Sequence, residues 1–371
     1  AYEFIQQKKG IGALLNYKDE QKKLSTHKLP DFISPAVKTF MPNSENLRVA
    51  VIGAGGFAKI KLLPIISQIS KVDISVVVDP DISTALNVAR LYNAKNPMTS
   101  TESIYSQDLA DVCVIASPHK FHCDQTLDAL RSGKAVFVEK PLATDWQQYE
   151  KLSSFLGQNP KSPLAVDFNR SCAPFIEKIK QVVSSRNSPL VVTYRMNAGF
   201  IPKDHWIQSS IGSGRIIGEA CHIFDLFYHL TDSKAVSVSV ESIKSKADDI
   251  FSTDNFSAQV SFEDGSICTL IYTALGSSAM SKERMEIFFD SKSIVMEDFL
   301  TLTGFGLPKS FNQSTYSQDK GHDALISKFF NNLKQKNFEH PIPINRLLDT
   351  TRLTLIIDKL ACQGGGNQDI L

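Results

Sequence analysis

The sequence predicts a two-domain α/β protein, in which a Rossmann domain precedes an α+β domain with a large, mostly antiparallel sheet. Three observations support this prediction. A short apolar run before a glycine-rich turn opens a series of strands that alternate with helices, which is typical of a parallel sheet covered on both faces. After about residue 169 the strand-like segments follow one another with few helices between them. The length of 371 residues is also too great for one ordinary core.

The first domain is expected over residues 47–168, after an N-terminal arm over residues 1–46. Its strands are predicted from apolar runs short enough for buried parallel strands, at 47–52, 73–78, 112–116, 135–138 and 164–168. The helices between them are predicted to extend through residue 69 and then over 83–92, 122–132 and 145–156.

The second domain is expected over residues 169–371, as a substrate-binding and oligomerisation domain. Its strand-like segments lie at 190–197, 236–243, 256–262, 266–274 and 286–289. The corner Glu263-Asp264-Gly265 predicts a hairpin. A last helix over about 346–362 precedes a Gly-Gly-Gly segment, which we expect to be mobile.

Composition and charge restrict the classes of function. The chain is 42% hydrophobic and 21% charged with a net charge of +1, which gives no electrostatic reason to expect nucleic acid or an anionic membrane as partner. No apolar run approaches the ~20 residues that span a bilayer. The six cysteines lack CxxC or CxxH spacing. We therefore expect a reduced, cytoplasmic protein without a structural zinc site. No other metal is expected in the site.

The glycine turn at residues 53–58 is typical of a dinucleotide site. Gly53 permits a tight turn, Gly55 lets the backbone approach a pyrophosphate, and the small Ala58 lets the next helix pack close to the sheet. Gly56 and Phe57 complete the turn. For this motif alone, a tight turn without a ligand is the alternative.

Asp79 ends the second strand, 24 positions after Gly55, where dinucleotide sites place an acidic residue. A carboxylate there accepts hydrogen bonds from ribose hydroxyls and repels a 2′-phosphate. Because no arginine lies within several residues, the sequence favours NAD over NADP. The alternative is that Asp79-Pro80-Asp81 is only a turn and a helix cap.

Two more segments, residues 116–122 and Glu139-Lys140-Pro141, close neighbouring strands and so lie at the sheet edge where ligands bind in such folds. Together with the glycine turn, residues 133–143 and Phe168-Asn169-Arg170, they make residues 47–170 resemble the Gfo/Idh/MocA family of NAD(P)-dependent sugar and polyol dehydrogenases. With the second-domain pattern, the resemblance extends to about residue 362.

The resemblance implies roles for particular residues. Lys140 would lie beside the nicotinamide and hydrogen-bond the substrate oxygen, where its charge would stabilise a developing alkoxide. Ser117, Pro118, His122 and Glu139 would join the glycine turn, Asp79 and Lys140 in binding the cofactor. A plain surface lysine is the alternative for Lys140.

The second family motif runs from a glycine turn into a helix with Asp-x-x-x-His. His222 matches the histidine, but Gly218 stands at the Asp position, with Glu219 beside it. Because residues three apart share a face of an α-helix, we expect Glu219 to orient His222, which would act as base or proton relay. A structural histidine is the main alternative, and metal ligation by Glu-x-x-His would need a second copy of the motif.

Substrate contacts are expected from Asn169 and Arg170, and from the loop that holds Lys203, His205 and Trp206. This loop offers donors and an aromatic platform of the kind that sugars favour. An ordinary irregular loop with a buried tryptophan is the alternative.

The sequence thus predicts reversible hydride transfer between NAD and a secondary alcohol of a sugar, polyol or sugar derivative, by a homodimer or homotetramer. Alternatives are a catalytically inactive cofactor-binding regulator, which the missing Asp at Gly218 favours, and an enzyme that reduces an imine or cleaves a glycoside through a transient redox cycle. A third is a module that works with a zinc dehydrogenase.

Residues 1–17 weakly resemble the end of medium-chain zinc alcohol dehydrogenases, which would make this chain the C-terminal half of a fused polypeptide. A plain N-terminal arm explains these residues equally well.

Overall fold

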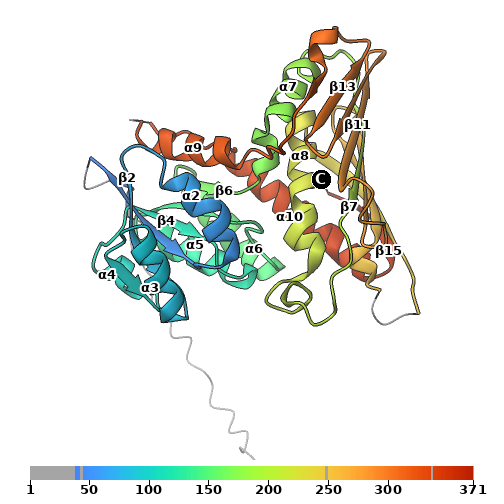
Figure 1. Cartoon of the computed structure of the whole chain (residues 1–371). Coiled ribbons are helices and arrows are strands. Elements are labelled where there is room, and N and C mark those ends of the chain that lie inside the picture. Colours follow the sequence, from blue (N-terminus) through green and yellow to red (C-terminus); the bar gives the residue numbers. More distant parts are fainter. Residues whose placement is uncertain (1–37, 42–44, 247–249, 336, 371) are drawn as a thin grey trace, which may run out of the picture. The chain divides into compact units, whose positions relative to one another are not determined.

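The computed structural model describes residues 38–41, 45–246, 250–335 and 337–370, which form two sheets (Figure 1). The strands of the first sheet are β1 (Leu47–Ile52), β2 (Val72–Val78), β3 (Asn96–Met98), β4 (Val112–Ile115), β5 (Ala135–Val138) and β6 (Leu164–Val166). They are all parallel, in the order β3-β2-β1-β4-β5-β6. This is the Rossmann order, in which ligands bind at the carboxyl ends of the strands where the order reverses.

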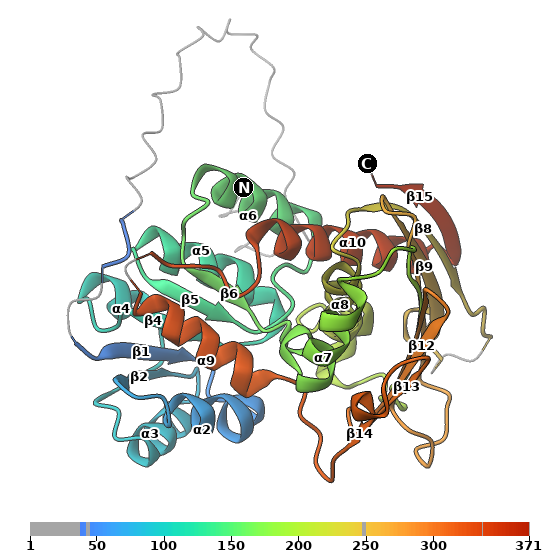
Figure 2. The same cartoon turned by 90° about the horizontal axis from the view of Figure 1, so that it is seen from above.

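Helices cover both faces of this sheet, with α2 and α3 on one side and α5 and α6 on the other (Figure 2). The segments between the strands are η1 (Ala58–Leu62), α2 (Leu63–Ile66), α3 (Ile82–Leu91), α4 (Glu102–Ser106), η2 (His119–Phe121), α5 (His122–Arg131) and α6 (Trp146–Gln158). The side chain of Asp145 accepts the Gln148 N–H and so begins α6. The central strands β4 and β5 are buried along their whole length, as the apolar runs predict.

The first core also takes a helix from late in the sequence. α9 (His322–Leu333) buries Leu325, Ile326 and Phe330 among the residues of the first sheet. Phe329 of this helix packs on Phe137 of β5, with 5.7 Å between the ring centroids. The first core therefore includes residues well beyond residue 168, where we expect the first domain to end.

The second sheet has nine strands in the order β14-β13-β12-β11-β7-β10-β9-β8-β15. Their bounds are β7 (Val191–Asn197), β8 (Ala235–Ser242), β9 (Phe256–Phe262), β10 (Ile267–Thr273), β11 (Glu283–Phe289), β12 (Lys292–Glu297), β13 (Thr301–Phe305), β14 (Gln313–Ser314) and β15 (Gly365–Asp369). Only the pair β7–β10 is parallel among these strands. The prediction of a mostly antiparallel second sheet is confirmed.

One face of this sheet is covered by helices (Figures 1 and 2). They are α7 (Pro174–Val183), α8 (Cys221–Thr231) and α10 (Ile344–Cys362), and the π-helical turn η5 (Ile216–Ala220) leads directly into α8. Short 3-10 turns complete the domain: η3 (Asn169–Cys172), η4 (Trp206–Gln208), η6 (Ser252–Asp254) and η7 (Lys309–Phe311).

The expectation of a mobile Gly-Gly-Gly segment is wrong. Gly365 and Gly366 begin β15, which pairs antiparallel with β8 at the sheet edge. Their φ angles are +125° and +148°, which residues with a side chain rarely adopt. A Cβ on Gly365 would also lie 2.8 Å from the Val240 carbonyl oxygen. The glycines permit this close approach of two strands, so they form structure instead of ending it.

Two expectations fall partly or wholly outside the described residues. Residues 1–37 and 42–44 of the expected arm are not described, and neither is the segment that resembles zinc alcohol dehydrogenases.

Among the helices that the structure describes, none is both long and apolar enough to cross a bilayer.

Candidate functional site

The glycine turn joins β1 to η1 and lies against the end of β4. Gly53 has φ +92°, and a Cβ on it would lie 2.6 Å from main-chain atoms of Ala116 and Ser117, so a side chain is excluded. A Cβ on Gly55 or Gly56 would meet no atom within 4 Å. At Gly55 and Gly56 the main chain of the turn therefore borders open space. A pyrophosphate could approach the main-chain N–H groups there.

Asp79 directly follows β2 and is bound to the glycine turn. Its Oδ2 accepts the Ala54 N–H at 3.0 Å, and its Oδ1 accepts the Asp81 N–H at 3.0 Å. The cap of α3 is Asp81, whose side chain accepts the N–H groups of Ser83 and Thr84. Because the two aspartates divide these roles, Asp79 is not a mere helix cap, and it lies where a ribose-binding carboxylate is expected.

His122 is fully buried and links the loops that follow β4 and β5. Its Nε2 lies 2.7 Å from the Ser117 carbonyl oxygen and its Nδ1 lies 2.8 Å from that of Pro141. Burial lowers the pKa of His122 in spite of these contacts. With both ring nitrogens engaged by main chain, His122 holds the two loops together. Pro118 is exposed, and the Ser117 hydroxyl donates to Gln125.

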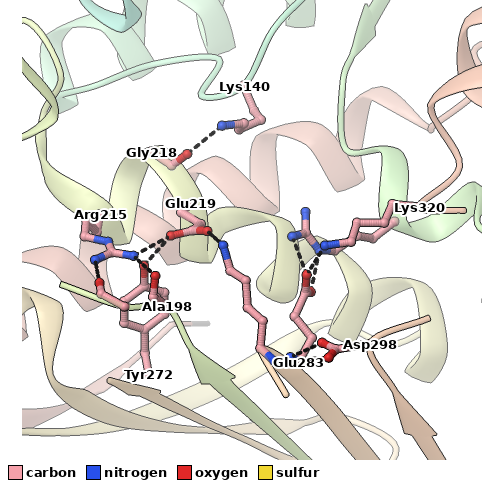
Figure 3. A network of polar contacts seen from close by, with 12 residues as sticks. Lys140, Ala198, Arg215, Gly218, Glu219, Tyr272, Glu283, Asp298 and Lys320 are labelled. Atoms are coloured by element: carbon pink, nitrogen blue, oxygen red, sulfur yellow. Dashed lines mark hydrogen bonds and ion pairs between the residues drawn. The ribbon is translucent and has the colours of Figure 1, made fainter. Parts of the chain in front are cut away.

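Lys140 follows β5 and reaches the second domain, where its Nζ donates a 2.7 Å hydrogen bond to the Gly218 carbonyl oxygen (Figure 3). Among the described residues it has no carboxylate partner. Its neighbour Glu139 is buried, and burial together with the Asp167 carboxylate raises the pKa of Glu139 well above its usual range. The ammonium group of Lys140 is therefore held at the carboxyl end of the parallel sheet, as a group that contacts substrate would be.

His222 lies in the first turn of α8 and is 6% exposed. Its Nδ1 is buried without a hydrogen-bond partner. Burial, and then the charges of Arg170, Lys140, His322 and Lys320, lower the pKa of His222 well below its usual value. The imidazole is therefore neutral near pH 7.

Glu219 contacts residues other than His222, which we expect it to orient. Its Oε1 accepts a hydrogen bond from Lys282 Nζ at 2.7 Å, and its Oε2 accepts from Arg215 Nη2 at 3.1 Å and from the Tyr272 hydroxyl. Burial opposes ionisation of Glu219, but these partners lower its pKa to about 2. The structure thus gives Glu219 a place in an ionic network and no contact with His222.

The helical winding before α8 explains why Glu219 does not contact His222. Residues Ile216–Ala220 form a π-helical turn with i→i+5 hydrogen bonding, and the α-helix begins only at Cys221. The rule that residues three apart share a face applies to an α-helix. It fails across this junction, and Glu219 is directed toward the sheet.

His119 fills the space beside Gly218. A Cβ on Gly218 would lie 2.7 Å from His119 Cε1 and 3.0 Å from Ile207 Cδ1. The buried His119 ring bonds the Gly212 carbonyl oxygen through Nδ1 at 2.7 Å and packs edge-on against Trp206, with 5.0 Å between the centroids. Burial, with the Lys140 charge adding to it, lowers the pKa of His119 to about 3. A neutral imidazole thus occupies the place where a side chain at position 218 would lie.

The predicted substrate residues have different surroundings. Asn169 and Arg170 begin η3, immediately after β6, and both are buried. Lys203 and His205 are exposed, and no described contact joins them to Lys140 or His222. Trp206, which is half-exposed, reaches the site through its contact with the His119 ring.

Buried polar side chains follow β5 and β6. The carboxyl groups of Glu139 and Asp167 interact with one another, whereas Asn169 Oδ1 and, on α8, His222 Nδ1 have no hydrogen-bond partner. A buried polar atom without a partner costs free energy, so these atoms indicate a site for a polar ligand. The described residues contain no group of three His, Cys, Asp or Glu side chains arranged to hold a metal ion.

Because His119 fills the space beside Gly218, substitutions at these two positions should be coupled in their effects on the free energy of unfolding. We expect Gly218→Ala to lower the free energy of unfolding by about 1–3 kcal/mol because of overpacking. In a His119→Ala background, which removes the nearest atoms, the same substitution should cost at least ~1 kcal/mol less. Urea denaturation of the four proteins of this double-mutant cycle measures the coupling. An equal cost of Gly218→Ala in both backgrounds would show that the two residues do not compete for space.

Comparisons with known proteins agree with this architecture. Residues 47–168 match the model of an oxidoreductase family with an NAD-binding Rossmann fold, and residues 180–295 match that of the GFO/IDH/MocA C-terminal domain. The inositol 2-dehydrogenase of Corynebacterium glutamicum is 26% identical over 205 residues, which cover 55% of this chain and 60% of that enzyme. The chain therefore matches less than two thirds of this relative's length.

Solved structures share the fold at lower identity. A putative myo-inositol dehydrogenase of Sinorhizobium meliloti is 18% identical, with a TM-score of 0.72 over 88% of this chain and 100% of that one. GenD2 from gentamicin A biosynthesis, solved in complex with NAD, is 17% identical, with a TM-score of 0.71 over 90% and 99% of the two chains. Both family models match in their expected order along the sequence, over segments that include the glycine turn, Lys140 and His222. The chain belongs to the GFO/IDH/MocA oxidoreductase family.

Proposed function

We propose that this chain is an NAD-dependent dehydrogenase that acts on a secondary alcohol of a sugar, polyol or sugar derivative. The main support is the placement of Lys140 near a buried, neutral His222, at the edge of the Rossmann sheet that also holds the glycine turn. The buried polar groups there, with Asn169 Oδ1 and His222 Nδ1 unpartnered, fit a polyhydroxylated ligand. The family, and relatives that are named inositol dehydrogenases, support the same class of reaction.

The residues divide the chemistry between charge stabilisation and proton transfer. A bound nicotinamide would supply the hydride acceptor or donor. Lys140 exchanges its hydrogen bond with the Gly218 carbonyl for one with the substrate oxygen and stabilises the alkoxide. His222, neutral before reaction, accepts the alcohol proton.

In this proposal the glycine turn and Asp79 bind the nucleotide, with Ser117 and Glu139 beside it. Asp79 carries the preference for NAD, since its carboxylate lies at the end of β2 and repels a 2′-phosphate. Isothermal titration of the protein with NADH and NADPH tests this directly. We expect micromolar NADH binding, weaker NADPH binding, and a smaller difference between them in Asp79→Ala. Absence of binding of either nucleotide would contradict the dehydrogenase proposal.

The lowered pKa of His222 sets an expected pH dependence. Because the folded-state pKa lies well below 6.5, the imidazole stays unprotonated as the pH falls from 8 to 6, so kcat/KM for alcohol oxidation should show no acid limb near 6.5. We expect His222→Asn to lower kcat by about 10²-fold while NADH affinity is retained. A clear acid limb at pH 6.5 in the wild type would contradict the lowered pKa of His222, and full activity of His222→Asn would remove His222 from the proton path. NAD binding without turnover of any polyol would instead favour the regulator.

We further propose that the open face of the second sheet binds a second copy of the chain. Val191, Ile267, Ile271 and Phe288 are 38–50% exposed on this face, and Val191 pairs in register with both Ile267 and Phe288. Contiguous exposed apolar side chains of this kind indicate an interface.

Sedimentation analysis tests the proposed oligomer. We expect a dimer or tetramer for the wild type and a shift toward monomer for Ile271→Asp, because the substitution introduces a charge into the apolar patch. The matched control is Gln107→Asp, at an exposed position of the first domain, which should not change the assembly. A monomeric wild type, or an unchanged Ile271→Asp assembly, would contradict this interface.

A further inference from the structure

A buried carboxylate of the second sheet is shared by two cations. Glu283 begins β11 and is fully buried, and its Oε2 accepts from Arg170 Nε at 3.0 Å and from the Tyr194 hydroxyl at 2.5 Å. Its Oε1 accepts from Arg170 Nη2 at 3.2 Å and from Lys320 Nζ at 2.6 Å (Figure 3). Glu283, Arg170 and Lys320 are called the Glu283 triad below. The triad has two positive charges for one negative charge.

The neighbouring network repeats this arrangement. Glu219 is shared by Arg215 and Lys282 and also accepts from the Tyr272 hydroxyl. Lys282 directly precedes Glu283 in the sequence, so this Glu219 triad and the Glu283 triad are adjacent (Figure 3). The Glu219 triad also has two cations for one carboxylate.

The accessible ends of the two triads are ammonium groups. The Lys282 side chain is 43% exposed and that of Lys320 is 21% exposed, whereas Glu283 is fully buried. Every oxygen of Glu219 and Glu283 already accepts a hydrogen bond from the protein. The nearby Asp298 carboxylate is likewise occupied, by the main-chain N–H groups of Lys282 and Glu283.

The lysines keep unused donors. An ammonium group has three N–H donors and no acceptor. Lys140, Lys282 and Lys320 each make one hydrogen bond within the described part of the chain, so each retains two donors. An oxyanion accepts several charge-assisted hydrogen bonds at once, and each is stronger than a hydrogen bond to a neutral sugar hydroxyl.

Other buried polar groups lie elsewhere in the site. They belong to Glu139, Asp167 and Asn169, after β5 and β6, and their oxygens suit the hydroxyl groups of a ligand. The site therefore has one side that accepts hydrogen bonds and another that donates them from cations. A ligand that satisfies both sides has hydroxyl groups at one end and negative charge at the other.

We propose that the substrate is an acidic sugar or polyol, whose oxyanion group, a carboxylate or a phosphate, is bound by Lys282 and Lys320 while its reacting carbon lies beside Lys140. This inference rests on the proposed dehydrogenase function, because it assigns the substrate of that same site. It goes beyond that function by naming the charge of the substrate and the side chains that select it.

Binding to the NADH complex tests the inference with matched ligands. The protein is first titrated with NADH, and the complex is then titrated with glucose, glucuronate and glucose 6-phosphate, and with galactose and galacturonate. We expect at least one acid to bind tenfold or more tightly than its neutral counterpart, with an advantage that shrinks as the salt concentration rises. Preference for the uronates indicates a carboxylate, and preference for the sugar phosphate indicates a phosphate.

Variants identify the side chains responsible. Lys282→Gln and Lys320→Gln should each reduce the preference for the acid at least threefold and leave NADH affinity unchanged. Lys161→Gln, at an exposed position before β6 and at the opposite edge of the first sheet, is the charge-matched control and should change neither quantity.

The outcomes separate this inference from the proposed function. If NADH binds and no acid binds more tightly than its neutral counterpart, the acidic substrate is refuted and the dehydrogenase proposal stands. If the preference for the acid survives in both lysine variants, the assignment of the binding residues is refuted. Failure of NADH to bind would refute the dehydrogenase proposal first, and this inference with it.

Discussion

The hydrogen bond from Lys140 Nζ to the Gly218 carbonyl oxygen connects the two halves of the site. On one side, Lys140 is fixed because it follows β5 and because His122 holds the neighbouring loop by its contact with the Pro141 carbonyl oxygen. On the other side, Gly218 lies in the π-helical turn that leads into α8 and His222. The same contact thus joins the lysine of the Rossmann domain to the turn that precedes His222 in the second domain.

Burying the ionic groups of the site costs free energy, and this cost indicates that they serve a function other than stability. Burying ion pairs such as Arg170–Glu283 gains little stability over apolar packing of the same volume, while breaking one leaves an uncompensated charge. The Arg170 charge, held in place by Glu283, also helps to keep His222 neutral. The ionic networks therefore set the protonation state and the position of groups in the site more than they stabilise the fold.

Much of the fold was predictable from local sequence pattern. The first sheet follows from apolar runs and turn glycines, which are local signals, and five of its six strands agree with expectation within a few residues. The short edge strand β3, Asn-Pro-Met, has no apolar run and was not predicted. The helix α9 was not predictable as part of the first core, because its packing on Phe137 depends on contacts between distant segments. β15 was missed because three glycines usually indicate a loop, whereas here the absence of Cβ atoms permits close pairing with β8.

The site shows the same division between local and distant signals. Gly53, Asp79 and Lys140 were identified from motifs at strand ends, and the structure gathers them with His222 at the carboxyl edge of the first sheet or beside it. The role of Glu219 was misjudged because a π-helical turn cannot be read from a three-residue spacing. His119 was missed although the segment Ser-Pro-His-Lys-Phe-His contains an additional histidine, since only the fold brings its ring against Gly218.

The pairing of His119 with Gly218 changes how the missing carboxylate is understood. If Gly218 marked a site in decay, the space of the lost side chain would be vacant or filled by apolar groups. Instead a histidine from the loop after β4 fills it, anchored by the Gly212 carbonyl oxygen. Because that imidazole is neutral, it adds no negative charge beside Lys140. A site with a neutral ring at this position, next to lysines with unused donors, is better suited to a negatively charged ligand than to a neutral one.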